Sequence, residues 1–171
     1  MVKTLDRAML VRARQVAQSV PDPELPMLTL ADLGILRDVA VTGSRVVVSL
    51  TPTYSGCPAI AEIRAEVASR LGAAGFADVE VRTVLSPPWT SDFISPEGRR
   101  KLAEAGIAPP RSRPEPSGLV ALTLFARGPR VDCPVCGSAD TVRTAAFSGT
   151  ACKDLYRCRA CAEPFEHVKE I

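Results

Sequence analysis

Four of the six cysteines form two Cys-x-x-Cys pairs that are separated by twenty-one residues. The pairs are Cys133 with Cys136 and Cys158 with Cys161. Two such pairs can place four thiolates at the corners of a tetrahedron, each about 2.3 Å from a Zn²⁺ ion. Because four thiolates leave no coordination position open for a substrate, the pattern predicts a structural zinc site. A single iron ion held by the same four thiolates is the alternative.

The zinc pairs lie in a short C-terminal segment whose size and charge limit its function. About 40 residues cannot bury a sufficient core, so the metal must supply stability. Residues 131–171 contain five basic and six acidic side chains. A phosphate-binding face needs clustered lysine and arginine instead. We therefore expect this segment to dock on a protein partner and not on nucleic acid.

The other two cysteines are Cys57 and Cys152, and the surroundings of Cys57 are the more informative. Cys57 precedes Pro58 where a loop is predicted to enter a helix, and proline fits the first helical turn. Cys57 therefore lies at or beside the N-cap, where unpaired N–H groups and the helix dipole favour a thiolate. Such a thiolate could act as a nucleophile or bind a metal, whereas a lone buried cysteine is commonly inert.

One thiolate cannot hold an iron–sulfur cluster by itself, because such clusters commonly take four protein thiolates. A cluster at Cys57 would be shared with a second copy of the chain in a homodimer, with a small thiol or with a client protein. Such sharing is typical of transfer rather than storage. An independent thiol enzyme is disfavoured, because the only histidine, His167, is far from Cys57 in sequence. We expect His167 to be a surface residue beside the ribbon.

The composition is that of an ordinary globular protein. The net charge is +2, apolar residues make up 46% and aromatic residues 5%, so the core must be aliphatic. Charges near the N-terminus prevent the apolar stretch of a secretory signal. The longest apolar run, residues 118–126, is far shorter than the ~20 residues that span a membrane. We expect a cytoplasmic protein with no membrane partner, in which paired cysteines bind metal instead of forming disulfides.

Apolar periodicity and turn residues predict the secondary structure. The predicted order is helix, hairpin, helix and strand, in residues 4–20, 35–51, 58–72 and 79–85. These elements predict an α+β fold, a small mixed sheet with helices on one face, followed by a C-terminal all-β zinc ribbon.

The chain is predicted to have three parts. Residues 1–86 would form the α+β domain and residues 119–171 the zinc ribbon. Residues 87–118 would connect them, because seven of the fifteen prolines lie there. Within this connecting segment we expect a short helix at residues 96–105 and a linker at residues 111–117.

Several motifs resemble known families. Three segments of the chain resemble the SufT-like domain family, which is associated with iron–sulfur protein maturation. They are Asp22-Pro23-Glu24, Asp32-Leu33-Gly34-Ile35, and Thr51-Pro52-Thr53 followed by Gly56-Cys57-Pro58. Further segments resemble the PaaD family, whose members are components of the phenylacetyl-CoA epoxidase system. These segments are residues 88–95, residues 149–158 and Glu163-Pro164-Phe165, together with the two cysteine pairs.

The resemblance implies an accessory or maturation factor in phenylacetate catabolism, and not an enzyme. It would assist iron or iron–sulfur assembly in the oxygenase or reductase subunits of the epoxidase through Cys57. The cofactors implied are a structural zinc and a transient iron or iron–sulfur cluster. With one histidine and no repeated Glu-x-x-His, the chain cannot itself build a ferritin-like di-iron site. The alternative is a non-catalytic structural subunit that stabilises the epoxidase complex.

The resemblance also implies roles for individual residues. Asp22 and Glu24 would lie near Cys57 and assist iron binding, although turn chemistry explains Asp22 equally well. Thr53 would hydrogen-bond the thiolate or simply end a strand. Trp89 would be a partner-facing anchor or part of the core. Cys152 would be a second transfer thiol or a buried small residue.

Overall fold

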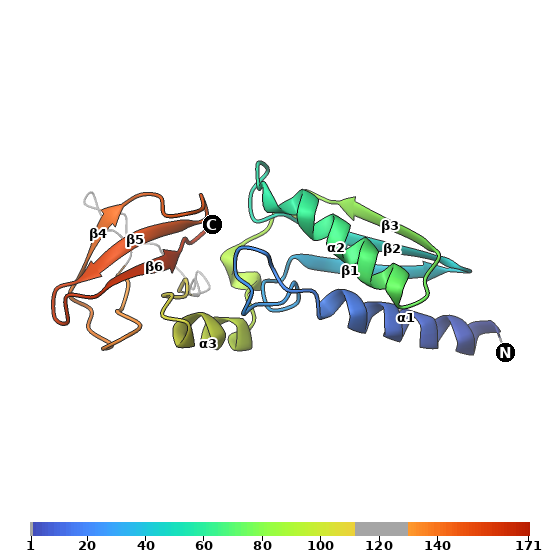
Figure 1. Ribbon diagram of the computed structural model, residues 1–171, viewed down its shortest axis with the longest axis horizontal. Helices are drawn as coiled ribbons and strands as arrows, with labels where there is room; N and C mark the ends of the chain where they lie inside the picture. The colour runs from blue at the N-terminus through green and yellow to red at the C-terminus, as the bar shows by residue number, and fades with distance from the viewer. Residues whose placement is uncertain (1, 112–129) are drawn as a thin grey trace, which may run out of the picture. The chain divides into compact units, whose positions relative to one another are not determined.

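The computed structural model describes residues 2–111 and 130–171 (Figure 1). The chain divides into two compact units, Met1–Gly98 with Ile171, and Arg99–Glu170. Almost all of the predicted linker at 111–117, and the predicted start of the ribbon at 119, lie outside the described residues. The division at 1–86, 87–118 and 119–171 therefore stays a prediction.

The first unit contains two helices and a three-stranded sheet. Its elements are α1 (Val2–Gln18), β1 (Leu36–Thr42), β2 (Arg45–Leu50), α2 (Ala59–Ala73) and β3 (Asp78–Thr83). The strand order is β1-β2-β3, with β1 antiparallel and β3 parallel to β2. Helix α1 packs on β1, α2 packs on β3, and the helices contact each other. Both helices therefore cover one face of a mixed sheet, which confirms the predicted α+β class.

Periodic burial explains why these segments form these elements. In β2, Val46, Val48 and Leu50 are buried while the residues between them are partly exposed, the two-residue period of a strand with one core face. Helix α2 buries a residue at every fourth position, which is the stripe of an amphipathic helix. Those residues are Ala59, Ile63, Val67 and Leu71.

The strand register brings three connecting segments to one end of this sheet. Leu36 at the start of β1 faces Leu50 at the end of β2, and Leu50 faces Thr83 at the end of β3. The chain before β1, the chain after β2 and the chain after β3 therefore meet at the end opposite the β1–β2 turn (Figure 1). The motifs that resemble the SufT-like family lie in the first two of these segments, and the PaaD-like residues 88–95 lie in the third.

The second unit is an antiparallel three-stranded ribbon. Its strands are β4 (Thr141–Ala145), β5 (Lys153–Cys158) and β6 (Pro164–Val168), in the order β4-β5-β6. Its buried cluster consists of Ala108, Val131, Cys133, Tyr156, Cys158 and Phe165. The predicted all-β ribbon is confirmed. The short helix η1 (Ser91–Phe93) and α3 (Pro96–Glu104) precede the ribbon in the chain, and α3 confirms the helix predicted at 96–105.

The expectation of a surface histidine is wrong. His167 is only 2% exposed, and its Nδ1 lies 2.8 Å from Oδ1 of Asp154, which is 4% exposed. The two residues face each other across β5 and β6. His167 is buried because it shares the inward face of β6 with Phe165, and Asp154 satisfies its ring nitrogen.

In the part of the chain that the structure describes, no helix combines the length and apolar content needed to cross a membrane.

Candidate metal centre and cysteine loop

The four predicted ligand cysteines lie together in the second unit. Their sulfur atoms are all within 4.8 Å of one another. Two sulfur pairs, Cys133 with Cys161 and Cys136 with Cys158, are 3.8 and 3.6 Å apart. The corners of a tetrahedron around Zn²⁺ with bonds of about 2.3 Å are about 3.8 Å apart. The donor set and its spacing therefore fit a tetrahedral tetrathiolate metal site.

Tight turns aim the sulfurs at a common point. The backbone N–H of Gly137 donates to the carbonyl of Cys133 at 2.9 Å, and the N–H of Cys161 donates to the sulfur of Cys158 at 3.5 Å. The residue after each pair has a left-handed backbone, with φ of 72° at Gly137 and 64° at Ala162. Both cysteine pairs thus end in the same kind of turn, although only the first has glycine at the left-handed position.

Backbone hydrogen bonds favour the thiolate form of one of the four cysteines, Cys158. Backbone N–H groups of Cys161 and then Ala160 lower the pKa of Cys158 to about 7, against the opposing effect of burial. The thiolate is the form that binds metal. Cys133 and Cys158 are buried, whereas Cys136 and Cys161 are exposed. A chelator in solution can therefore approach the cluster from one side.

Replacing Ala162 with glycine is expected to leave metal binding intact and to raise or maintain stability. A left-handed backbone costs a non-glycine residue about 1–2 kcal/mol, which glycine avoids. The matched control is Ala160→Gly, an exposed position without positive φ, where the added chain entropy should destabilise. Thermal unfolding of the metal-loaded protein measures both variants. An Ala162→Gly variant as unstable as Ala160→Gly would contradict the expectation.

Cys57 lies immediately before helix α2 in the first unit. Its N–H donates to the carbonyl of Tyr54 at 3.1 Å, and its own carbonyl accepts from Ile60 at 3.4 Å. Pro58 is the N-cap of α2, with φ −67° and ψ −29°. Cys57 is thus one residue outside the N-cap, and it is partly exposed. Its position beside the N-cap agrees with the prediction.

Hydrogen bonds between distant segments shape the end of the sheet where Cys57 lies. The N–H of Thr51 donates to the carbonyl of Ile35 at 2.9 Å, and the N–H of Val84 donates to that of Leu50 at 2.8 Å. The indole Nε1 of Trp89 donates to the carbonyl of Leu33 at 2.8 Å. The Asp-Leu-Gly-Ile, Thr-Pro-Thr and Pro-Trp motifs therefore form one connected structure.

Asp32 organises this structure through its side chain and its carbonyl, a role that was not predicted from the sequence. Its Oδ2 accepts from the N–H and hydroxyl of Thr29 at 3.0 and 2.9 Å, and Thr29 Oγ1 accepts from the N–H of Asp32. The carbonyl of Asp32 accepts from the N–H of Ser95 at 2.8 Å. The reciprocal bonds follow the Thr-x-x-Asp spacing of a capping box, a signal that the sequence does contain. Asp32 therefore positions the loop around Leu33 and Gly34.

Asp22 is held inside its own turn. It is 6% exposed, and its Oδ1 accepts hydrogen bonds of 2.9 Å from the N–H groups of both Glu24 and Leu25. This geometry is the turn chemistry that was the alternative explanation. A role of Asp22 or of the partly exposed Glu24 in iron binding at Cys57 stays a prediction.

Asp22→Ala is expected to destabilise the first unit by about 1–3 kcal/mol, because two N–H groups lose their acceptor. Asp22→Asn keeps an oxygen at the Oδ1 position and should cost clearly less. Urea denaturation followed by Trp89 fluorescence measures both. Equal losses for the two variants would show that the carboxylate charge, and not the turn, is what matters.

The other residues singled out in the sequence, Trp89, Thr53 and Cys152, each lie in a different environment. Trp89 is 5% exposed and its N–H is satisfied, which is what the core alternative expects; its role as a partner-facing anchor stays a prediction. Thr53 is partly exposed and lines a pocket of about 250 Å³ with Thr51 and Tyr54; its bond to the Cys57 thiolate stays a prediction. The sulfur of Cys152 lies 3.1 Å from Thr150 Oγ1 and is not one of the four clustered sulfurs.

Comparison with known proteins agrees with this arrangement. An iron–sulfur cluster assembly protein family model matches residues 12–83, and a PaaD zinc beta ribbon domain model matches residues 120–169. A crystal structure of a DUF59 domain from Bacillus anthracis superposes with a TM-score of 0.54 and 26% identity, over 58% of this chain and 96% of that one.

The fold, the four clustered cysteines and the two family models define a protein with an iron–sulfur assembly-type domain followed by a zinc ribbon. An Escherichia coli K12 protein described as the D component of a "Putative 1,2-phenylacetyl-CoA epoxidase" is 41% identical over 152 residues, which cover 89% of this chain and 87% of that protein. This chain belongs to the PaaD family. The assembly-type domain and the family membership together support an accessory role.

Proposed function

We propose that this protein is an accessory maturation factor of the phenylacetyl-CoA epoxidase system. It assists the assembly of iron or iron–sulfur centres in the oxygenase or reductase subunits through Cys57. The observation that carries the proposal is the position of Cys57: it stands at the start of α2, on the end of the sheet where three motif-bearing segments are hydrogen-bonded together. The match of this domain to an iron–sulfur assembly family supports it.

The chemistry proposed for Cys57 is ligand exchange on a metal cargo. Its thiolate would supply one ligand, and the start of a helix stabilises negative charge there. Because clusters commonly take four protein thiolates, the other ligands must come from a small thiol, from a second copy of this chain or from the client. Replacement of Cys57 and of those other ligands by side chains of the client would complete the transfer, so Cys57 acts as a carrier and no covalent bond of an organic substrate changes.

The four clustered cysteines would hold zinc, which supplies a fixed cross-link between the two turns and no reaction. We propose a structural role because all four ligands are protein thiolates. The protein would work in the cytoplasm as a non-enzymatic partner of the epoxidase subunits.

The decisive test compares wild type, Cys57→Ser and the control Cys152→Ser, purified anaerobically with iron and sulfide supplied. Zinc content should be the same in all three. Iron, or a thiolate-to-iron absorption band, should appear in wild type and Cys152→Ser only. The epoxidase co-expressed with Cys57→Ser should contain less iron than with either of the others. Normal iron loading of both client subunits alongside Cys57→Ser would overturn the proposal.

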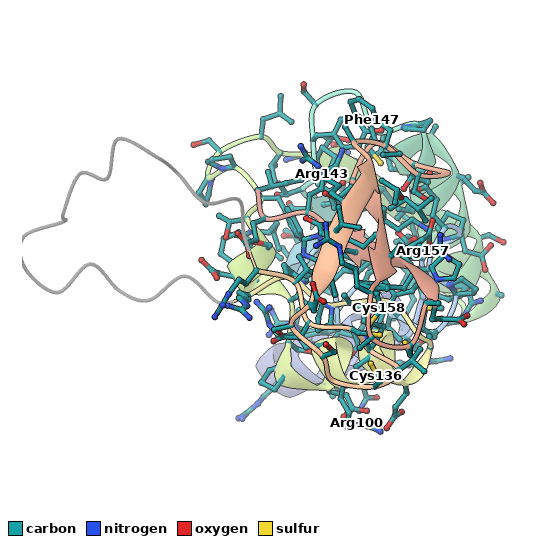
Figure 2. All side chains as sticks on the ribbon, turned by 90° about the vertical axis from the view of Figure 1, so that its left-hand side faces the viewer. Arg100, Cys136, Arg143, Phe147, Arg157 and Cys158 are labelled. Carbon is teal, nitrogen blue, oxygen red and sulfur yellow. The ribbon has the colours of Figure 1, made fainter. Side chains whose placement is uncertain are left out.

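A second candidate is a structural subunit that stabilises the epoxidase complex. Two exposed apolar side chains of the second unit favour it, since Val135 and Phe147 are 62% and 66% exposed. Figure 2 shows Phe147 at the end of the ribbon away from Cys136 and Cys158. This function predicts stoichiometric co-purification with the complex that Cys57→Ser leaves unchanged and Phe147→Ser weakens. Loss of client iron in Cys57→Ser with the complex intact would favour maturation instead.

A further inference from the structure

A groove of about 410 Å³ lies between the proline-rich turn and helix α2. Pro21 and Pro23 line one side of it, and Ala65 and Ser69 of α2 line the other. The small side chains on the helix leave room for another chain to approach closely. The groove belongs entirely to the first unit.

The groove carries negative charge on its helical side. Glu62 and Glu66 line it together with Ala65 and Ser69, and the i, i+3, i+4 and i+7 spacing puts all four on one face of α2. Glu66 accepts a hydrogen bond from Nε of Arg70 at 2.6 Å. Among the described residues no cation pairs with Glu62. One carboxylate of the groove is therefore available to a cation from outside.

The opposite wall is held in place before any partner binds. The two hydrogen bonds to Asp22 Oδ1 fix the turn, and the N–H of Asp22 donates to the carbonyl of Leu28 at 2.9 Å. A β-bridge joins Pro21 to Thr29. Because the wall is rigid, little conformational entropy is lost when the groove is filled. Asp22 thus shapes the groove without lining it.

We propose that this groove docks the client protein, through a client segment in which lysine or arginine adjoins an apolar side chain. The apolar residue would rest between the prolines and Ala65, and the cation would meet Glu62 and Glu66. Two carboxylates, one of them already paired, suit an organic cation on an apolar stem better than a metal ion.

The groove is close to the thiol along the helix. Glu62 and Glu66 follow Ala59, the first residue of α2, by three and seven residues, a rise of roughly 5–10 Å at 1.5 Å per residue. A client segment docked in the groove would therefore contact the same helix that begins beside Cys57. This inference rests on the proposed maturation function and names the surface that selects the client.

The test measures the affinity of the full chain for the purified oxygenase component of the epoxidase and, separately, for its reductase. Glu62→Lys/Glu66→Lys should weaken binding to the client by about 10-fold or more at low salt, because two attractive charges become repulsive. Ala65→Trp fills the groove without changing charge and should also weaken binding. The control Asp78→Lys reverses an exposed charge at the start of β3 and should bind like wild type.

The folding of each variant is checked by its thermal unfolding and zinc content. Ala65→Trp and the double lysine variant binding both components as tightly as wild type would overturn the proposal. So would a change in self-association alone, which would assign the groove to a second copy of this chain. Weakened binding that is restored by reversing one client lysine or arginine to glutamate would establish the contact.

Cys57→Ser separates this inference from the function on which it rests. If Cys57→Ser binds the client normally and fails to load it with iron, the maturation function stands whatever the groove variants do. If Cys57→Ser loads iron normally while the groove variants fail to bind, the groove is a client site and the transfer role of Cys57 is wrong.

Discussion

Replacing Cys158 with serine is expected to release the metal and unfold the second unit. Cys158 is 0% exposed and belongs both to the sulfur cluster and to the buried cluster of the ribbon. Apparent zinc-binding free energies of small modules are about 10–16 kcal/mol, as large as the whole stability of a typical domain, about 5–15 kcal/mol. Losing one of four ligands should therefore leave the ribbon without enough stability to fold.

Elemental analysis and the dispersion of ribbon amide signals in NMR spectra measure this effect. The matched control is Cys152→Ser, which removes a thiol of the same unit that is not one of the four clustered sulfurs. Removing metal from wild type with a chelator should reproduce the Cys158→Ser spectrum. A folded ribbon with no bound metal would show that the core alone is sufficient.

Lowering the pH should release the metal from the four cysteines, as a chelator does. Metal binding requires deprotonated thiols, so protons compete with the metal and its affinity falls as pH falls. Hydrogen bonds from the N–H groups of Cys161 and Ala160 lower the pKa of Cys158 to about 7, so this ligand resists protonation better than an ordinary thiol. Metal release should therefore increase steadily with acidification, which a colorimetric zinc indicator can follow.

The second large effect is expected from Gly34→Ala in the first unit. Gly34 has φ of 66°, and a Cβ built on it would lie 2.5 Å from both Cβ and the carbonyl oxygen of Phe93. The left-handed backbone costs about 1–2 kcal/mol, and the clash with a fixed backbone about 1–3 kcal/mol more. The free energy of unfolding should fall by roughly 2–5 kcal/mol.

Gly43→Ala separates these two costs. Gly43 has φ of 60°, and nothing lies within 4 Å of its built Cβ, so alanine there suffers only the backbone strain. Urea denaturation followed by the fluorescence of Trp89, whose indole donates to the neighbouring residue Leu33, measures both variants. Equal losses at Gly34 and Gly43 would mean that the loop carrying Phe93 moves aside freely.

Features that depend on near neighbours in the chain could be predicted from the amino-acid sequence. Two cysteines separated by two residues in a tight turn present their sulfurs to one point, so spacing alone identified the four that cluster. The helix and strand periods likewise predicted the order of elements, because each is a local pattern of burial. The position of Cys57 beside α2 followed from Pro58 for the same reason.

Which side chains are buried, and what they contact, depends instead on how distant segments pack together. Trp89 donates to a carbonyl 56 residues away, and His167 pairs with Asp154 on the neighbouring strand. The sequence around Asp22 would be the same whether its carboxylate bound a metal ion or accepted hydrogen bonds from backbone N–H groups of its own turn. The roles of these side chains depend on hydrogen bonds and packing between segments that are distant in the chain. Strand register brings those segments together, and no local sequence pattern contains that register.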